Sequence, residues 1–499
     1  PPRSTLFPYT TLFRSGSALI IDQSDPEGLL RYVHHTNSLN NWRSDPALLK
    51  AYVMNSGEAV NWLYDRARLN GTSKDAPNDK GLFMYLDTSQ DFTGPWSDGR
   101  YSSFDYGEAK VHMYAPWMGP KPNNVGTIMT YVLEEAVAEF GGRLKVYYKT
   151  PGVQVIKENG KVTGVVGKLA DGSYVKFTAN KAVILATGDY MNNNSMVNRW
   201  SPDVDGFDKK QYGKTGDGHL MAVTAGAVME KLGHTKMLHD FDSGLMYEEP
   251  FLYVNIKGKR FCNEFVGFVY MNDIMVHQDF YKGGKNIQDR ERGSKGWYCQ
   301  VYDSTYMDHE SVSGLVPPTV MEKYMPEISD EEYAAAHDGT PRTGVFPALI
   351  DTYRADTLDE LADKLGIEDK EAFLATIKRY NELCKSGVDE DFGKDAKWMN
   401  PIETGPFYGI RKHIRVSALC SGVYTNENGQ ALDAEDKPIE GLYCVGNLGG
   451  QFYGGADYPF HATGLSLGRC YTFGRLAGKH AASLAGGTNT IVETGTVSA

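Results

Sequence analysis

The segment GLYCVGNLGGQFYGG, residues 441–455, decides the fold of this chain. A short apolar strand ends at Gly446-Asn447, and the glycine-dense stretch after it predicts that the backbone approaches another group closely. From Thr463-Gly464 the chain turns into an apolar helix expected over 465–482, whose first N–H groups are free to face a carbonyl oxygen or a phosphate. This order predicts a bound cofactor, although a lone strand-loop-helix unit also occurs in many α/β proteins.

A second segment, KAVILATGDY at 181–190, supports the cofactor, because it is a buried-type strand that ends in Ala-Thr-Gly. Together the two segments resemble the FAD-binding flavoprotein family of fumarate reductase, urocanate reductase and 3-ketosteroid dehydrogenase, over residues 27–478. The resemblance implies an α/β (α+β) protein, in which a Rossmann-like FAD-binding domain with an antiparallel meander carries an inserted α+β capping domain. It also implies FAD, bound without a covalent link.

The resemblance places FAD contacts at eight residues: Val153 near the adenine, and Thr187, Gly188, Gly446, Asn447, Gly464, Leu465 and Ser466. Asn447 stands where most relatives have a glutamate. An amide can still hydrogen-bond a ribityl hydroxyl, so the substitution is compatible with binding.

The beginning of the chain departs from the family. Residues 1–15, PPRSTLFPYTTLFRS, match an in-frame translation of a common sequencing adapter, so we exclude them from the fold and expect native sequence to begin near Gly16. No G-x-G-x-x-G turn follows a strand anywhere in the sequence. We therefore expect that the first βαβ unit, roughly 40–60 residues, is missing, and that the chain as written holds FAD weakly.

The pattern of the remaining chain predicts two parts of an FAD-binding domain, 16–238 and 399–486, around a cap at 239–398, with a tail at 487–499. Asn159-Gly160 and Asp171-Gly172 are typical hairpin turns and predict a three-stranded meander. Hydrophobic spacing predicts the other elements: helices at 124–140, from 216, at 358–365 and at 370–383, and strands at 144–148, 153–157, 162–168, 174–177 and 183–186.

Composition limits the classes of molecule that this chain is expected to bind. The 499-residue chain has a net charge of -12, which disfavours nucleic acid and favours small molecules. Its six cysteines form no C-x-x-C pair, so we expect no metal or iron–sulfur site, and their scatter suits a reducing, cytoplasmic location. No apolar run reaches the ~18 residues of a membrane span. The sequence leaves open whether an export signal lies upstream.

The motif Arg260-Phe261-Cys262-Asn263-Glu264 matches the family's R-F-x-N-E. In fumarate reductases an arginine proton donor lies downstream of it, but aligned by the motif that position is Phe268 here. A second substrate arginine falls on or near His461, and a substrate histidine falls on Ala418. A dicarboxylate would lose charge-assisted contacts of roughly 1.5–3 kcal/mol each, so we exclude fumarate and expect an enone or an acrylate-type substrate.

Hydride transfer from flavin N5 to a C=C bond requires a proton donor and a group that polarises the carbonyl. Four side chains combine suitable chemistry with a place that the resemblance defines near the site: Tyr458, His461, His239 and Tyr270. For Tyr270 the alternative of an aromatic side chain that packs the cap is favoured over a catalytic role, and His239 could equally be structural. We interpret Cys420 as a small apolar filler rather than a thiolate.

Three functions remain open. The first is a reductase of an activated C=C bond, with an unidentified electron donor. The second is a dehydrogenase that runs the same chemistry backward on a ketosteroid or acyl substrate. The third is a truncated fragment without catalytic activity.

Overall fold

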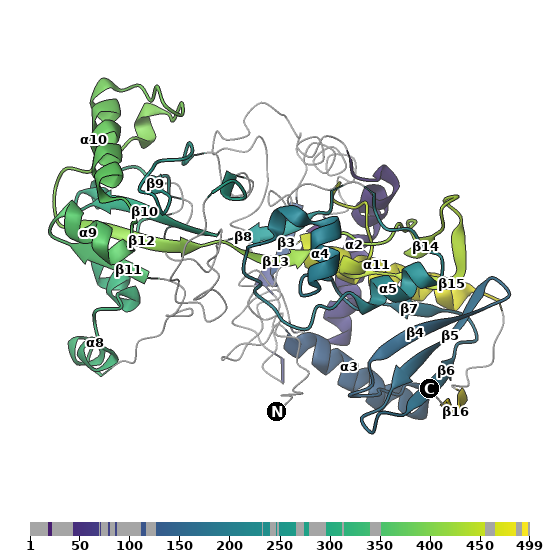
Figure 1. Cartoon of the computed structure of the whole chain (residues 1–499). Coiled ribbons are helices and arrows are strands. Elements are labelled where there is room, and N and C mark those ends of the chain that lie inside the picture. The colour runs from purple at the N-terminus through teal and green to yellow at the C-terminus, as the bar shows by residue number, and fades with distance from the viewer. Residues whose placement is uncertain are drawn as a thin grey trace.

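A computed structural model describes the chain over residues 18–21, 43–68, 126–231, 233–239, 249–265, 274–278, 296–311, 314–339, 351–454, 465–485 and 492–497. It also describes the short stretches 70, 78–79, 85–86, 111–115 and 246. The FAD-binding part and the cap lie at opposite ends of the molecule, with strands β8 (Lys236–His239) and β13 (Arg415–Leu419) between them (Figure 1).

The FAD-binding part is organised around a parallel strand pair, β7 (Val183–Leu185) and β15 (Pro438–Cys444). Strand β14 (Gln430–Leu432) extends this sheet on the other side of β15. Helix α11 (Leu465–Ser483) packs against α2 (Pro46–Arg66). Short helices α4 (Asn194–Trp200) and α5 (Asp217–Thr224) follow β7. A separate sheet has the order β1 (Ala18–Ile21), β3 (Val111–Ala115) and β2 (Tyr85–Leu86).

The predicted antiparallel meander is confirmed. Strands β4 (Gly152–Glu158), β5 (Lys161–Lys168) and β6 (Tyr174–Thr178) pair in sequence order. The first turn is tight, with positive φ of 52° at Asn159 and 86° at Gly160. The tail carries a strand that the sequence analysis missed, because β16 (Val492–Val497) pairs with β6.

One predicted strand is wrong. Helix α3 (Gly126–Phe140) and the 3-10 turn Gly141–Arg143 lie where expected, but residues 144–148 form no strand. A β-strand exists only when another strand supplies its hydrogen bonds, and none among the described residues pairs with this segment. The apolar side chains of residues 144–148 do not form a buried face either, since Tyr148 is 72% exposed.

The cap contains a four-stranded sheet in the order β11 (Asp351–Ala355), β12 (Phe407–His413), β10 (Trp297–Asp303) and β9 (Leu252–Val254). Helix α9 (Leu358–Leu365) lies where predicted, and α10 (Lys370–Ser386) extends the predicted range. Both begin at a side-chain cap, Thr357 or Asp369, and end at a left-handed glycine. Helices α7 (Pro318–Met321) and α8 (Asp330–Ala336) complete it.

The four-stranded sheet continues past residue 398, where the sequence analysis expects the cap to end. Strand β12 pairs with both β10 and β11, so the cap sheet extends to His413. The hydrophobic pattern could not show this, because β12 and β13 are nearly continuous along the chain and differ only in which strands they pair with.

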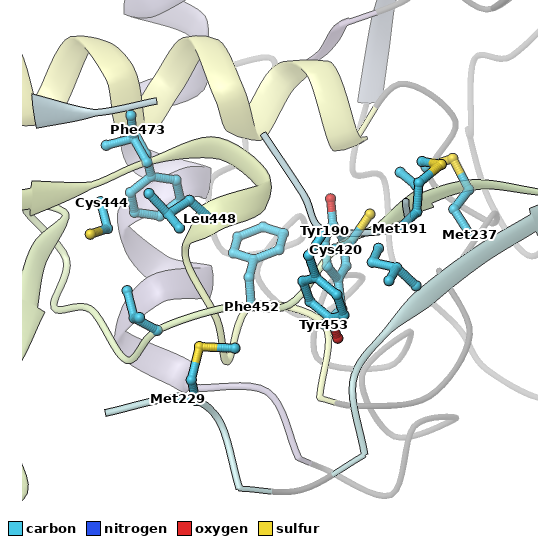
Figure 2. Close-up of a cluster of buried hydrophobic side chains, with 14 of the residues drawn as sticks. Tyr190, Met191, Met229, Met237, Cys420, Cys444, Leu448, Phe452, Tyr453 and Phe473 are labelled. Carbon is cyan, nitrogen blue, oxygen red and sulfur yellow. The ribbon is translucent and has the colours of Figure 1, made fainter. Parts of the chain in front are cut away.

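The largest core cluster fills the FAD-binding part (Figure 2). Phe452 makes edge contacts with Phe473 of α11 and Tyr52 of α2, with ring centroids 5.9 and 5.5 Å apart. These contacts seat the glycine-rich segment after β15 against two helices. A second cluster lies between the cap sheet and helices α9 and α10.

Candidate functional site

The carboxyl ends of β7 and β15 lie side by side. Cys444 is in register with Leu185, and the Val445 N–H donates to the Leu185 carbonyl at 3.0 Å. Since the strands are parallel, the residues after each strand reach the same edge of the sheet. The structure therefore brings together the four predicted contacts Thr187, Gly188, Gly446 and Asn447.

Close packing at this edge depends on glycine. A Cβ on Gly218 of α5 would lie 1.9 Å from the Thr187 Oγ1, so only glycine lets the helix approach the end of β7. Gly188 and Gly446 have φ of 78° and 68°, a left-handed conformation that other residues adopt at a cost. Both segments thus turn sharply away from their strands and leave main-chain atoms at the edge.

Arg469 ties the first turns of α11 to this edge, and the sequence analysis did not identify it. Its guanidinium donates to the Gly446 carbonyl at 2.8 Å and to the Asn447 Oδ1 at 3.0 Å, while the side chain is buried. Arg469 is the first charged residue of the helix, four residues after its start, and this position is the signal that could have revealed it.

Asp189 is the second residue that the sequence analysis missed. Its carboxyl is 1% exposed and accepts a hydrogen bond from the Met191 N–H at 2.9 Å. Burial raises the pKa of Asp189 to about 6, against the weaker, opposite effects of the Lys214 charge and of hydrogen bonding from Met191, Leu419 and Asn447. A buried carboxyl next to a predicted contact marks this edge as a candidate functional site.

A buried polar group lies behind the same edge. The Tyr190 hydroxyl hydrogen-bonds the His234 Nδ1, and the other His234 nitrogen contacts the Glu230 carbonyl at 2.9 Å. Burial lowers the pKa of His234 and lowers that of His219 to about 3, so both imidazoles are neutral near pH 7. Neutral imidazoles add no charge behind the edge.

These residues fit the flavin end of the FAD that the resemblance implies. Thr187 and Asn447 offer a hydroxyl and an amide for a polyol chain, and the glycine turns leave room for close approach. Of the remaining predicted contacts, Leu465 is 3% exposed, Ser466 is half-buried and Val153 on β4 is 43% exposed. Gly464 lies outside the described residues.

The predicted catalytic residues stay predictions. Tyr458, His461 and Tyr270 lie outside the described residues, as does Phe268. The backbone of His239 ends β8 and pairs with Arg415 of β13, which places it on the strands that lead to the cap, but its side chain is not described. Ala418 and Cys420 are buried, at 5% and 1% exposure, in the core beside these strands.

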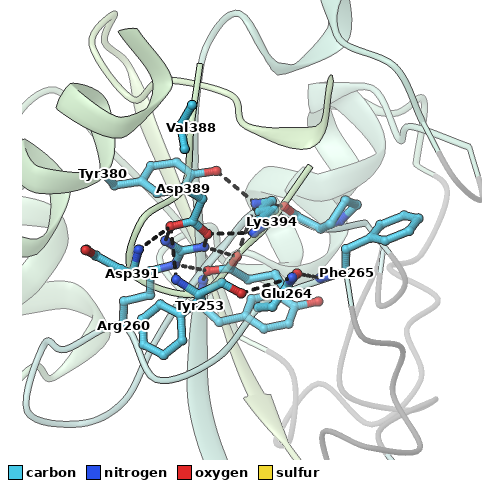
Figure 3. A network of polar contacts seen from close by, with 12 residues as sticks. Tyr253, Arg260, Glu264, Phe265, Tyr380, Val388, Asp389, Asp391 and Lys394 are labelled. Atoms are coloured by element: carbon cyan, nitrogen blue, oxygen red, sulfur yellow. Dashed lines mark hydrogen bonds and ion pairs between the residues drawn. The ribbon is translucent and has the colours of Figure 1, made fainter. Parts of the chain in front are cut away.

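The R-F-x-N-E motif has a structural role here (Figure 3). Arg260 donates to both Glu264 oxygens at 2.9 Å and to Asp389 at 2.9 and 2.7 Å. Lys394 lies 3.2 Å from Glu264 and donates to the Tyr380 hydroxyl at 2.9 Å. We call these five residues the cap clamp, because they join the segment after β9 to the loop after α10.

Within the described ranges, no group of three or more His, Cys, Asp or Glu side chains has the arrangement of a metal site. A search of the helices in those same ranges finds none long and apolar enough to cross a membrane. All six cysteines are free thiols.

The chain matches the FAD binding domain family over residues 8–458. It is 27% identical over 343 residues to the vinyl phenol reductase of Lactiplantibacillus plantarum, covering 65% of each protein. It is 28% identical over 372 residues to the 3-oxosteroid 1-dehydrogenase of Mycobacterium tuberculosis strain H37Rv, covering 68% of this chain and 60% of the relative. The chain thus spans less than two thirds of the length of these relatives.

Among solved structures, the chain is similar to the 3-ketosteroid delta1-dehydrogenase of Sterolibacterium denitrificans, in complex with 1,4-androstadiene-3,17-dione. The TM-score is 0.63 at 19% identity, and the match covers 95% of this chain and 92% of that one. This likeness shows a shared fold.

Proposed function

Because the chain belongs to the FAD-binding domain family, we propose that it is an FAD-dependent oxidoreductase that reduces an activated C=C bond in a small molecule. The preferred substrate is an enone or an acrylate-type compound rather than fumarate. Relatives named for vinyl phenol reduction and for 3-oxosteroid dehydrogenation support a CH–CH oxidoreductase of this kind.

One observation carries the proposal. The segments after β7 and β15, which are far apart in the sequence, meet at one edge of a parallel sheet with Thr187, Gly188, Gly446 and Asn447 together. In open α/β sheets, ligands bind at the carboxyl ends of the strands. The strands β8 and β13 lead from this part toward the cap, so a substrate held between the two parts is next to the cofactor edge (Figure 1).

Bound FAD supplies the hydride to one carbon of the double bond. The chain's own residues then have two tasks: one side chain protonates the neighbouring carbon, and a hydrogen bond stabilises the charge on the carbonyl oxygen. We propose Tyr458 and His461 for these tasks, with His239 and Tyr270 as the alternatives. The Ala418 methyl group lacks the charge that a carboxylate substrate would require.

The test is a substrate panel with the FAD-loaded protein and a reduced dye as electron donor. We expect turnover of an enone, an aryl acrylate or a vinyl phenol and none of fumarate. The Tyr458→Phe and His461→Ala variants should each lower kcat about 100-fold at unchanged flavin content. Fumarate turnover equal to that of the enone would refute the substrate class, and wild-type rates in both variants would move the donor to His239 or Tyr270.

A dehydrogenase acting in the desaturating direction is the second candidate, and the 3-oxosteroid 1-dehydrogenase relative favours it. The two directions share one site, and the electron partner decides between them. Reduction of an electron-accepting dye by a saturated 3-ketosteroid, at a rate above that of the reverse reaction, would select this candidate. We further propose a cytoplasmic location, supported by the free thiols.

A further inference from the structure

Asp189 is a buried carboxyl that no cation in the described part of the chain contacts directly. Among the described residues no lysine, arginine or histidine lies within ion-pairing distance of its carboxyl. Its carboxyl accepts a hydrogen bond from the Met191 N–H, two residues along the chain, and the Leu419 backbone and the Asn447 side chain also hydrogen-bond to it. A buried ionised carboxyl without an ion pair is costly, so a role beyond this local turn is expected.

Asn447 lies between Asp189 and a buried cation. Its Oδ1 accepts a hydrogen bond from Arg469 at 3.0 Å, and its side chain hydrogen-bonds toward the Asp189 carboxyl. An amide offers one carbonyl oxygen and one NH₂ group. Because Arg469 donates to the amide oxygen of Asn447, the NH₂ group is the end that donates to Asp189. This fixes the orientation of the amide.

The exposure of the three residues separates their roles. Asp189 and Arg469 are buried, at 1% and 2% exposure, whereas Gly446 and Asn447 are half-buried. The NH₂ group carries two hydrogens, and Asp189 uses one of them. The second hydrogen of Asn447 is then available to an oxygen of a ligand at the edge of the sheet.

We propose that Asp189 and Arg469 are positioning residues that hold Asn447 from both sides, so that position 447 binds a hydroxyl of the cofactor's polyol chain. The inference rests on FAD as the cofactor of the proposed function. It assigns to Asp189 and Arg469 a part in cofactor binding that neither the sequence motifs nor their positions in the core suggested.

The simplest alternative is that Asp189 only closes a local turn with Met191. An asparagine makes the same turn through its side-chain oxygen. Asp189→Asn therefore keeps the turn and removes the carboxyl that orients Asn447, which separates the two explanations.

The test measures the Kd for FAD by quenching of flavin fluorescence, and the Tm of the protein without FAD. We expect Asp189→Asn to weaken FAD binding about tenfold while the Tm does not fall. Asn447→Asp, which places two carboxyls in contact, should weaken binding at least as much. The double variant Asp189→Asn/Asn447→Asp restores one carboxyl and one amide, and should recover binding to within about threefold of the wild type.

Asp389→Asn in the cap clamp is the matched control, because it also neutralises a buried aspartate. It should lower the Tm and leave the Kd for FAD unchanged. If Asp189→Asn binds FAD as tightly as the wild type, or if the double variant binds no better than Asn447→Asp alone, the proposed positioning is wrong. If the wild type binds no FAD at millimolar cofactor, the proposed function fails, and this inference fails with it.

Discussion

The two buried aspartates Asp389 and Asp189 have opposite surroundings. Asp389 accepts two hydrogen bonds from Arg260, and although burial opposes it, these bonds and nearby N–H groups lower its pKa to about 2. Asp189 has no such partner among the described residues, and burial raises its pKa to about 6. The neighbours of Asp389 hold that carboxyl ionised, whereas burial disfavours the ionised form of Asp189 more than its neighbours favour it.

The difference separates a structural group from the group that we propose to be functional. In the cap clamp each charge meets an opposite charge, so its residues need nothing from outside (Figure 3). At the strand edge, polar groups gather with incomplete charge compensation beside half-buried Asn447. Perturbed carboxyls of the second kind cluster at functional sites. A family motif, by contrast, identified the structural group.

Breaking the cap clamp is expected to have the largest effect. Arg260→Met leaves the Glu264 and Asp389 carboxyls buried without their shared partner, which costs about 3–5 kcal/mol in the free energy of unfolding. Chemical denaturation measures this loss, and FAD titration of the folded variant should give the wild-type Kd. A weakened Kd would show that the clamp also supports the cofactor edge.

Gly218→Ala, which fills the contact between α5 and β7, should have the second-largest effect on stability. In Gly218→Ala the new methyl group overlaps Thr187, because the added Cβ would lie 1.9 Å from the Thr187 Oγ1, and overpacking of this kind costs about 1–3 kcal/mol. Because Thr187 must move, FAD binding should weaken as well. Gly474→Ala in α11, where a Cβ meets nothing within 4 Å, is the control: it should leave FAD binding unchanged and should not lower stability, because alanine favours a helix over glycine.

Neutralising Asp189 should have an effect of comparable size and opposite sign. Its folded-state pKa of about 6 lies above the usual 3.8, so the native state keeps a proton that the unfolded chain releases, and stability falls as pH rises between these values. Above pH 6 the stability of the wild type is lowered by the full cost of burying the ionised Asp189 carboxyl. Asp189→Asn should therefore stabilise the FAD-free protein by about 1–3 kcal/mol at pH 8.

The stability difference between the wild type and Asp189→Asn should disappear at acidic pH. Near pH 4 the carboxyl is protonated in the native state, and the two proteins should have nearly equal stability. The charged or titratable groups next to Asp189 are the positive Lys214 and Tyr190, and burial raises the pKa of Tyr190 far above this window. A stability difference that does not depend on pH would contradict the raised pKa.

An exposed ion pair should have the smallest effect. Arg379 on α10 contacts Glu390 and Asp391 at 3.2 and 2.8 Å, but its side chain is 45% exposed. Water already stabilises these charges, so Arg379→Met should leave the unfolding midpoint within experimental error. A loss comparable with that of Arg260→Met would show that burial does not separate the two arginines.

The sequence by itself determined the elements with strong local signals. Asn-Gly and Asp-Gly turns identified the meander, and hydrophobic spacing identified α9 and α10, because these signals depend only on residues close in the sequence. Thr187-Gly188 and Gly446-Asn447 were recognisable for the same reason. The strand predicted at 144–148 failed because pairing requires a partner that local pattern does not reveal.

Only the tertiary structure decided which polar residues share a site. Asp189, Asn447 and Arg469 come from three separate segments, and the parallel register of β7 and β15 brings the first two together. The cap clamp likewise joins residues 129 positions apart, Arg260 and Asp389. Charge compensation and burial are properties of the folded environment, so a carboxyl that is held ionised and one whose ionised form is disfavoured look the same in the sequence.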